Sequence, residues 1–373
     1  MQVSKISLKN NPSIEFIAKF LAPHTKRAYL VGGCVRDLLL GLEITDFDIE
    51  VYDINPHKFD SLMQEFNANG FGKSFFVYKF KNYDLSLARS ENKIAKGHKG
   101  FEVSICNDEK LAAKRRDFSI NSMMINIFND EFLDLYGGLE DLKARTLRHV
   151  DDLSFIEDPL RVLRALHFVA RFDLKIAQNS LNLMKTMDIN ELSKDRINAE
   201  LYKFFKARNL RLGFEFLQTL NLEKTIFFTD TKAHEKIQSF KTVLENSRKF
   251  IKNEGLFLYL YLNFFELDKD AFFKKTRLKK SLLSSAKQPF FEDKINDLDL
   301  AKIALKMPLS QWLGLWDEKR INRAKKLGIY KKALRAKIDT SLVEGQGLQG
   351  RALGEKIEEL RIQWLKAYLR KQN

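Results

Sequence analysis

Residues 30–50 constrain the fold more than any other stretch of the chain. The apolar residues 29–31 are typical of a buried strand, and Gly32 and Gly33 follow them directly. Residues 34–40 have helical spacing, and Gly41 stands where that helix would end. A glycine turn before a helix exposes backbone N–H groups and the positive end of the helix dipole, which together bind phosphate. We therefore predict a strand–turn–helix unit with an anion site, to which Arg36 adds a forked positive charge.

Two carboxylates begin the next predicted strand. Acidic and apolar residues alternate from Asp46 to Val51, so Asp46 and Asp48 project side by side from one strand face. Such a pair suits two hard cations about 3.5–4 Å apart, as in phosphoryl or nucleotidyl transfer. A Gly-Gly pair by itself is usually only a turn, and an isolated Asp-x-Asp is usually a solvated strand face or a cap. Their combination favours a metal-dependent nucleotidyltransferase site.

Composition limits the partners and the compartment. The 373 residues carry a formal charge of +15, which indicates a polyanionic partner such as RNA, DNA or a membrane surface. Phenylalanine is abundant and proline and glycine are scarce, as in a helix-rich globular chain of two to three domains. Cys34 and Cys106 are the only cysteines, and neither has metal-ligand spacing, which indicates a reducing compartment. The sequence has neither a signal-like start nor an apolar run of about 18 residues, so we expect a cytoplasmic protein.

Asp84 is a candidate third carboxylate. Residues 71–80 and 83–88 alternate as strands around a turn at residues 81–82. If the second strand lies beside the Asp46/Asp48 strand, Asp84 faces the same metals; otherwise it is an edge-strand charge. Residues 89–100 are polar and basic, and we expect them to form a mobile loop beside the site.

Two further polar segments contain candidate substrate-binding residues. In residues 114–121, Arg116 can grip a triphosphate while Asp117 caps a helix over 118–124 or orients the arginine; a surface charge cluster is the alternative. Residues 157–172 predict a helix with Asp158 as N-cap, Pro159 in the first turn and one apolar face. Glu157, Asp158 and Arg161 gather within about one turn, where they can read the edge of a base.

The chain beyond residue 175 is helix-patterned throughout and contains two basic clusters. One lies in residues 274–280, and the other places nine Lys or Arg in residues 319–337 without an acidic residue between them. Such runs are usually solvated faces, but the +15 charge favours contact with an RNA backbone.

These motifs, in this order, resemble the class II tRNA nucleotidyltransferases, or CCA-adding enzymes, within the bacterial family that also contains poly(A) polymerases. The matching stretches are 30–48, 87–93 with 97–101, 115–121, 136–150 and 157–172, and 344–360 resembles the family's C-terminal segment more loosely. The resemblance implies an α+β fold: a nucleotidyltransferase head with a small DNA polymerase β-like sheet and helices, then an all-helical neck, body and tail. The expected boundaries are 1–145, 146–210, 211–285 and 286–373.

The resemblance also implies roles for the candidate residues. Asp46 and Asp48 would bind two Mg²⁺ ions, with Asp84 as a further catalytic carboxylate. The nucleotide would be held by Gly32, Gly33, Arg36, Arg116, Asp117, Asn121, Glu157, Asp158, Arg161 and Arg164. The substrates would be CTP, ATP and tRNA, with no membrane and no obligatory protein partner, and residues 89–100 would help the switch from C to A. The chain lacks the His-Asp dyad of some relatives, so phosphohydrolase activity is not expected.

Other readings stay open on the sequence. The same chemistry could add only CC, only A, or a poly(A) tail. A non-catalytic RNA-binding protein built on the same head is disfavoured, because a scaffold does not need two adjacent uncompensated carboxylates.

Overall fold

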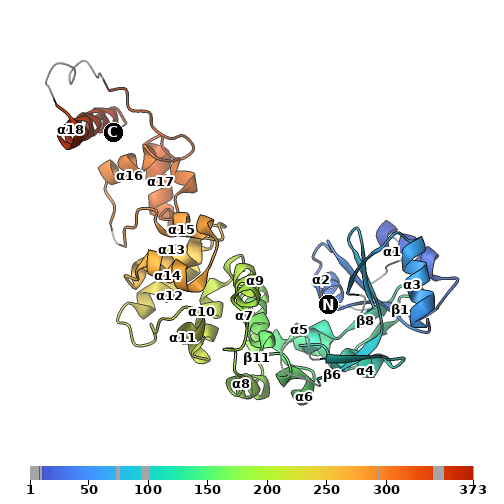
Figure 1. Ribbon diagram of the computed structural model, residues 1–373. Helices are drawn as coiled ribbons and strands as arrows, with labels where there is room; N and C mark the ends of the chain where they lie inside the picture. Colours follow the sequence, from blue (N-terminus) through green and yellow to red (C-terminus); the bar gives the residue numbers. More distant parts are fainter. Residues whose placement is uncertain are drawn as a thin grey trace. The chain divides into compact units, whose positions relative to one another are not determined.

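The computed structural model describes residue 8 and residues 11–72, 76–93, 101–292, 294–338 and 348–372. The chain forms two compact units, Met1–Ile197 and Asn198–Asn373 (Figure 1). The finer division into head, neck, body and tail stays a prediction. Within the described residues, no helix is long and apolar enough to cross a membrane.

The first unit is built on a seven-stranded mixed sheet of order β3-β4-β5-β2-β1-β8-β9. Its strands are β1 (Ala28–Val31), β2 (Phe47–Val51), β3 (Asn69–Gly72), β4 (Val77–Phe80), β5 (Tyr83–Leu87), β8 (Met124–Asn126) and β9 (Phe132–Leu133). β2 and β5 are parallel, and the other neighbouring strands are antiparallel. Two small sheets are separate: β6 (Arg89–Lys93) with β7 (Phe101–Ile105), and β10 (Thr146–Leu147) with β11 (Lys175–Ile176).

Helices surround this sheet and continue the unit. They are α1 (Pro12–Leu21), α2 (Gly33–Leu39), α3 (Pro56–Glu65), α4 (Glu109–Lys114), the 3₁₀ turn η3 (Ser119–Asn121), α5 (Gly138–Lys143), α6 (Asp152–Ile156), α7 (Leu160–Phe172), α8 (Gln178–Lys185) and α9 (Lys194–Phe205), which runs into the second unit. The start of α1 follows from its sequence: the Asn11 side chain accepts a hydrogen bond from the Ser13 N–H at 3.0 Å, and Pro12 occupies the first turn.

The two faces of the sheet differ in chemistry. α1 and α3 cover the apolar face, where Phe16 packs on Phe66 and Phe59 packs edge-on against Tyr78, each with ring centroids 5.6 Å apart. The opposite face carries the acidic residues of β2, because side chains alternate along a strand. The covered face anchors the sheet, and the acidic face is left for chemistry.

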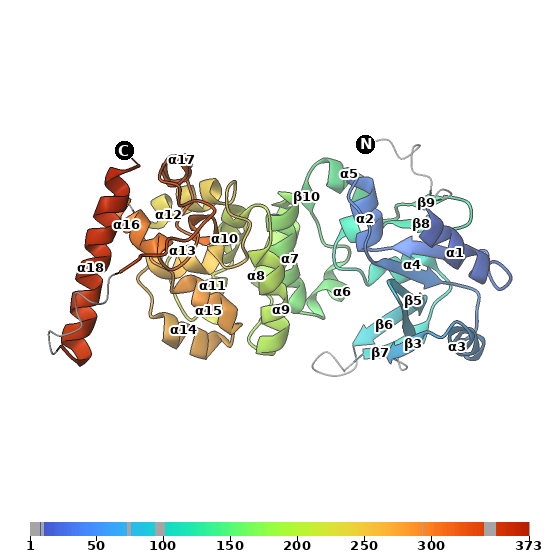
Figure 2. The same cartoon turned by 90° about the horizontal axis from the view of Figure 1, so that it is seen from above.

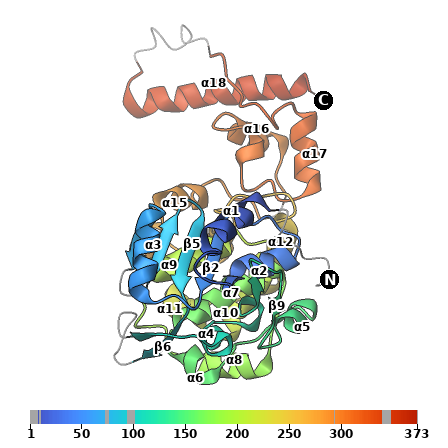
Figure 3. The same cartoon turned by 90° about the vertical axis from the view of Figure 1, so that its right-hand side faces the viewer.

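The second unit is helical within its described residues. Its elements are α10 (Leu210–Thr219), α11 (Leu222–Ile226), α12 (Ile237–Ser247), α13 (Leu256–Phe264), α14 (Lys269–Thr276), α15 (Lys280–Ala286), α16 (Asp297–Ala304), η4 (Leu309–Gln311), α17 (Glu318–Lys326) and α18 (Gly350–Arg370). α13 is apolar all round and lies at the centre of α10–α15 (Figure 2), with Phe257 edge-on to Phe204 at 4.9 Å. α18 packs on α16 and lies across one end of α17 (Figure 3), where the Tyr368 hydroxyl donates to the Leu327 carbonyl at 2.7 Å.

Most predicted elements are confirmed, and four are wrong in extent. The predicted strand over residues 71–80 is wrong: residues 71–72 belong to β3 and residues 77–80 form the antiparallel strand β4, while residues 73–75 lie outside the described residues. Residues 118–124 form η3 and the start of β8 rather than a helix, because a short apolar run fits a buried strand equally well. Residues 89–93 form β6 instead of a loop, because they pair with residues 101–105; residues 94–100 lie outside the described residues. The helical pattern predicted beyond residue 175 begins one residue too early, because Ile176 belongs to the short strand β11.

Candidate active site

The three candidate carboxylates converge on two adjacent strands. Asp48 on β2 and Asp84 on β5 are direct partners in the parallel register, so their side chains share one face, and Asp46 stands one step before β2. Asp48 and Asp84 line a pocket of about 480 Å³, and Asp46 is not part of its lining. The other polar lining residues are Lys79, Ser86, Arg89, Arg115 and Arg116. The predicted neighbourhood of Asp84 and the Asp46/Asp48 strand is confirmed.

The electrostatics of this group suit a hard cation. Burial raises the pKa of Asp48; Arg116 opposes this rise, and the charges of Asp84 and Asp46 add to it. Asp84 forms an ion pair with Lys79, whose Nζ lies 3.1 Å from Oδ1. A divalent cation would relieve the repulsion among the carboxylates, which are the oxygen ligands that Mg²⁺ prefers. The described ranges contain no cluster of three His, Cys, Asp or Glu side chains able to hold a metal, so phosphate or water oxygens would have to complete the coordination.

The glycine turn borders this pocket. Gly32 has φ of +73°, a conformation that other residues rarely adopt. A Cβ atom at Gly32 would lie 3.5 Å from Arg116 Nη1 and 3.6 Å from Asp48 Oδ2. Gly32 therefore lets the chain turn into α2 directly beside the carboxylates, as the strand–turn–helix prediction requires.

Arg36 lies in a buried network and is not part of the pocket lining. It is 4% exposed, its Nη2 lies 2.7 Å from Asp37 Oδ1, and its Nη1 donates to Asn121 Oδ1. Its guanidinium also lies over the ring of Phe172, 4.6 Å from the centroid. Burial lowers the pKa of Arg36, and Asp37 counters that effect. In this geometry Arg36 ties α2 to η3, and its role as a phosphate ligand stays a prediction.

Asp117 and Asn121 organise the segment after Arg116. Asp117 Oδ1 accepts hydrogen bonds from the Phe118 N–H and from Asn121 Nδ2, both at 2.9 Å, while Oδ2 accepts from Arg164 Nε at 2.6 Å. Burial would raise the pKa of Asp117, but Arg164 and Asn121 bring it down to about 2. Asp117 thus orients Arg164 on α7, a long-range contact that sequence spacing does not reveal.

The start of α7 is joined to the same segment. Asp158 Oδ1 accepts from the Leu160 N–H at 3.1 Å and forms an ion pair with Arg196 at 3.1 Å. Arg161 Nη2 donates to the Arg115 carbonyl at 2.6 Å, and its Nη1 donates to the Ser154 carbonyl at 2.8 Å. Asp158 and Arg161 therefore have different partners, although they lie within one turn. Glu157 is the C-cap residue of α6, and its contact with a base stays a prediction.

The sequence reading assigned no role to two residues that support the site. Glu50 is fully buried, and its Oε2 lies 2.7 Å from Arg115 Nη2 and 2.8 Å from Arg116 Nη2. Its position continues the series 46, 48, 50 on one strand face, which was the available signal. Cys34 Sγ donates to the Asp46 carbonyl and accepts from the Asp48 N–H, both at 3.1 Å. Burial, followed by the charge of Asp48, raises the pKa of Cys34 to about 12, so the thiol is neutral at pH 7.

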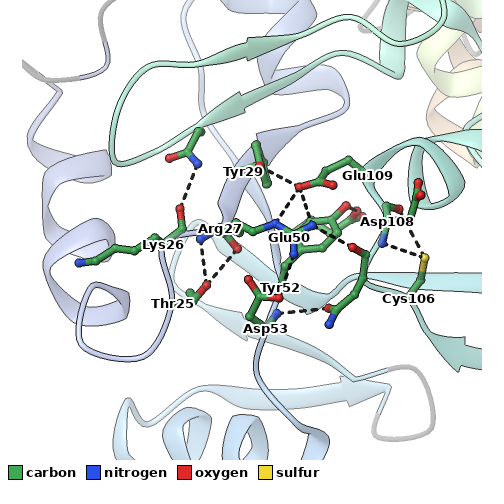
Figure 4. A network of polar contacts seen from close by, with 12 residues as sticks. Thr25, Lys26, Arg27, Tyr29, Glu50, Tyr52, Asp53, Cys106, Asp108 and Glu109 are labelled. Carbon is green, nitrogen blue, oxygen red and sulfur yellow. Dashed lines mark hydrogen bonds and ion pairs between the residues drawn. The ribbon is translucent and has the colours of Figure 1, made fainter.

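Two neighbouring polar networks lie near Glu50 (Figure 4). In the first, the Tyr52 hydroxyl donates to Glu50 Oε1 at 2.8 Å. Nearby, Glu109 accepts hydrogen bonds from Arg27 Nη2 at 2.8 Å and from the Tyr29 hydroxyl at 2.9 Å. Two Glu–Arg–Tyr clusters therefore brace β1, β2 and α4, and only the cluster of Glu50 includes arginines of the pocket lining.

A small mixed sheet with carboxylates on adjacent strands, a glycine turn and arginines at one pocket is the arrangement expected of a nucleotidyltransferase head. A largely helical remainder follows it. More particularly, residues 28–148 match the Poly A polymerase head domain. Proteins with this chemistry generally use divalent metal ions.

Known relatives agree with this assignment. Over 213 residues the chain is 38% identical to the CCA-adding enzyme of Francisella tularensis subsp. tularensis, a region covering 53% of this chain and 56% of that enzyme. Over 198 residues it is 40% identical to the CCA-adding enzyme of Coxiella burnetii, covering 50% of each chain. The chain thus matches about half the length of these curated relatives.

Solved structures resemble nearly the whole chain. A structure described as a tRNA-processing enzyme, apo form I, is 25% identical with a TM-score of 0.63, and the match covers 96% of this chain and 99% of that one. A Thermotoga maritima CCA-adding enzyme complexed with tRNA is 21% identical with a TM-score of 0.64, covering 100% and 97%. The predicted resemblance and the predicted fold class are therefore confirmed.

Proposed function

We propose that this protein adds C, C and A to the 3′ end of tRNA from CTP and ATP, without a nucleic-acid template. The observation that carries the proposal is the pairing of Asp48 with Asp84 beside Asp46, at a pocket that Arg115 and Arg116 also line. The relatives named CCA-adding enzymes and the similar structures described with ATP, CTP and tRNA support this choice of substrates. We further propose a cytoplasmic enzyme that needs no protein partner.

Asp46 and Asp48 would hold two Mg²⁺ ions, with phosphate or water oxygens completing the coordination and Asp84 as a further catalytic carboxylate. When bound, such ions activate the 3′ hydroxyl of the RNA and neutralise the triphosphate. Arg116 lies beside Asp48 and Gly32, where its charge can bind the phosphates and keep the α-phosphate in line with the hydroxyl. We assign base recognition to the start of α7, where Asp158 and Arg161 are held by other partners and therefore present fixed donors and acceptors.

The product distinguishes CCA addition from its alternatives. Three tRNAs, ending before the triplet, after one C and after two, are incubated with CTP and ATP, and their 3′ ends are sequenced. All three are expected to reach the same CCA end and stop, and a rigid recognition site should accept C or A but not G or U. Long A tails would identify a poly(A) polymerase, and a halt at CC, or extension of the CC-ended tRNA alone, would identify a half-enzyme.

Lysines at the end of the second unit are proposed to bind the tRNA backbone. Of the nine basic residues in 319–337, Arg320 is buried and donates to the Gly314 carbonyl at 2.8 Å, and Arg323 pairs with Asp297. The other seven are exposed, and four lysines among them form two adjacent pairs: Lys325 with Lys326, and Lys331 with Lys332.

Neutralising these four lysines together is expected to weaken tRNA binding and leave the KM for ATP unchanged. The log–log slope of affinity against salt should shrink by about one for each lost phosphate contact. Filter binding over a range of salt concentrations measures this slope. The matched control neutralises four exposed lysines elsewhere in the same unit, namely Lys224, Lys232, Lys249 and Lys252. Equal slopes for the two variants would place the RNA on another surface.

A further inference from the structure

Glu50 differs from the other acidic residues of the site face because it is sealed from solvent. Its side chain is 1% exposed, whereas those of Arg115 and Arg116 are 15% and 20% exposed and line the pocket. One oxygen of Glu50 receives both guanidiniums, at 2.7 and 2.8 Å, and the other receives the Tyr52 hydroxyl. Burial would raise the pKa of Glu50, but the two arginines bring it below its ordinary value.

Two adjacent guanidiniums repel each other unless a negative charge lies between them. Glu50 supplies that charge from the buried side of the arginines, away from the pocket. The hydrogen bond from the Tyr52 hydroxyl fixes the plane of its carboxylate. Each arginine has five N–H donors in a planar fork, so one bond to Glu50 sets the direction of the others. Triphosphate oxygens are the ligands that such a pair of forks recognises.

We infer that Glu50 is a positioning residue that sets Arg115 and Arg116 to bind the triphosphate of the incoming nucleotide, and that Arg115 is a substrate-binding residue beside Arg116. This inference rests on the proposed nucleotidyl transfer and adds to it the residue that orients the two phosphate-binding arginines. The Arg115 carbonyl also accepts a hydrogen bond from Arg161, which links the phosphate-binding arginines to the start of α7.

The test compares nucleotides that differ only in their phosphates. ATP and adenosine are titrated by calorimetry with Mg²⁺ and without tRNA, so that no transfer occurs. Glu50→Gln keeps the side-chain shape but places an amide against two cations. ATP is expected to bind at least tenfold more weakly to this variant, and adenosine to change less than twofold. In turnover, the KM for CTP and ATP should rise more than kcat falls.

Two further variants separate positioning from simple folding effects. Glu109→Gln is the matched control, because Glu109 braces Arg27 and Tyr29 of the same sheet away from the pocket; it should leave ATP binding unchanged. Tyr52→Phe removes only the second support of Glu50 and should weaken ATP binding about two- to fivefold. This second variant keeps the inference testable if Glu50→Gln does not fold.

The outcomes are distinguishable. If wild-type protein binds ATP no better than adenosine, the proposed function itself fails. If wild-type protein prefers ATP and both Glu50→Gln and Tyr52→Phe retain that preference, the inference about Glu50 fails while the proposed function stands. Equal losses for ATP and adenosine would reduce Glu50 to a purely structural residue and overturn the positioning role.

Discussion

Replacing Asp48 with asparagine is expected to lower kcat for nucleotide addition by at least ~10³-fold, equivalent to about 4 kcal/mol of transition-state stabilisation. The neutral amide binds a divalent cation much more weakly than a carboxylate does, because it lacks the negative charge. The fold should be unharmed or slightly more stable, because burial and the charges of Asp84 and Asp46 all disfavour the ionised form of Asp48. Single-turnover extension of a tRNA ending in CC, together with thermal unfolding, measures both effects.

Two comparisons sharpen this result. Asp53→Asn changes a carboxylate just beyond β2 that pairs with Arg27 instead of facing the pocket, so its rate should match that of the wild type. Asp84→Asn should lose as much activity as Asp48→Asn or less, because Lys79 already neutralises part of its charge. Turnover above a few per cent for Asp48→Asn at saturating magnesium would remove the metal assignment. An unaffected Asp84→Asn would make that residue an edge-strand charge.

The glycine turn and the paired carboxylates of this site could be predicted from sequence, because each pattern involves only a few neighbouring residues. Gly32 is predicted as a turn and has the positive φ that only glycine adopts freely. Asp46 and Asp48 are predicted to share a strand face. Alternation along β2 places Asp48 on the polar face, whereas Asp46 lies one residue before the strand begins. Neither conclusion needs knowledge of what lies across the sheet.

The parts that could not be predicted depend on contacts between distant segments. Alternation places Glu50 on the polar face, but it does not show that Arg115 and Arg116, sixty-five and sixty-six residues later, bury it. Arg36 has the sequence position of an anion ligand, yet Phe172 and Asn121 enclose it from two other elements. A pattern within one element assigns a face, and only the tertiary packing decides whether that face is solvent, pocket or core.

Replacing Gly138 with alanine is expected to destabilise the first unit by roughly 3 kcal/mol, the upper part of the range for overpacking. Gly138 is the first residue of α5, and a Cβ there would lie 2.1 Å from the Ser119 carbonyl oxygen and 2.9 Å from Met123 Cγ. The obstacle is backbone within η3, which cannot rotate away as a flexible side chain would. Ser119 follows Asp117 by two residues, so the displacement should also reach Arg116 and reduce nucleotide addition.

The chain offers a matched control and a way to assign the effect to one unit. Gly354→Ala changes an exposed position of α18 with no atom within 4 Å, and it should stabilise the second unit by about 0.5–1 kcal/mol. The three tryptophans lie at 312, 316 and 364, so their fluorescence reports on the second unit, while far-ultraviolet circular dichroism reports on both. In urea, Gly138→Ala should shift the circular dichroism transition without shifting the fluorescence transition, and Gly354→Ala should shift the fluorescence transition upward. Because the predicted strain comes from a backbone oxygen at Ser119, a wild-type unfolding curve for Gly138→Ala would mean that α5 and η3 do not approach so closely.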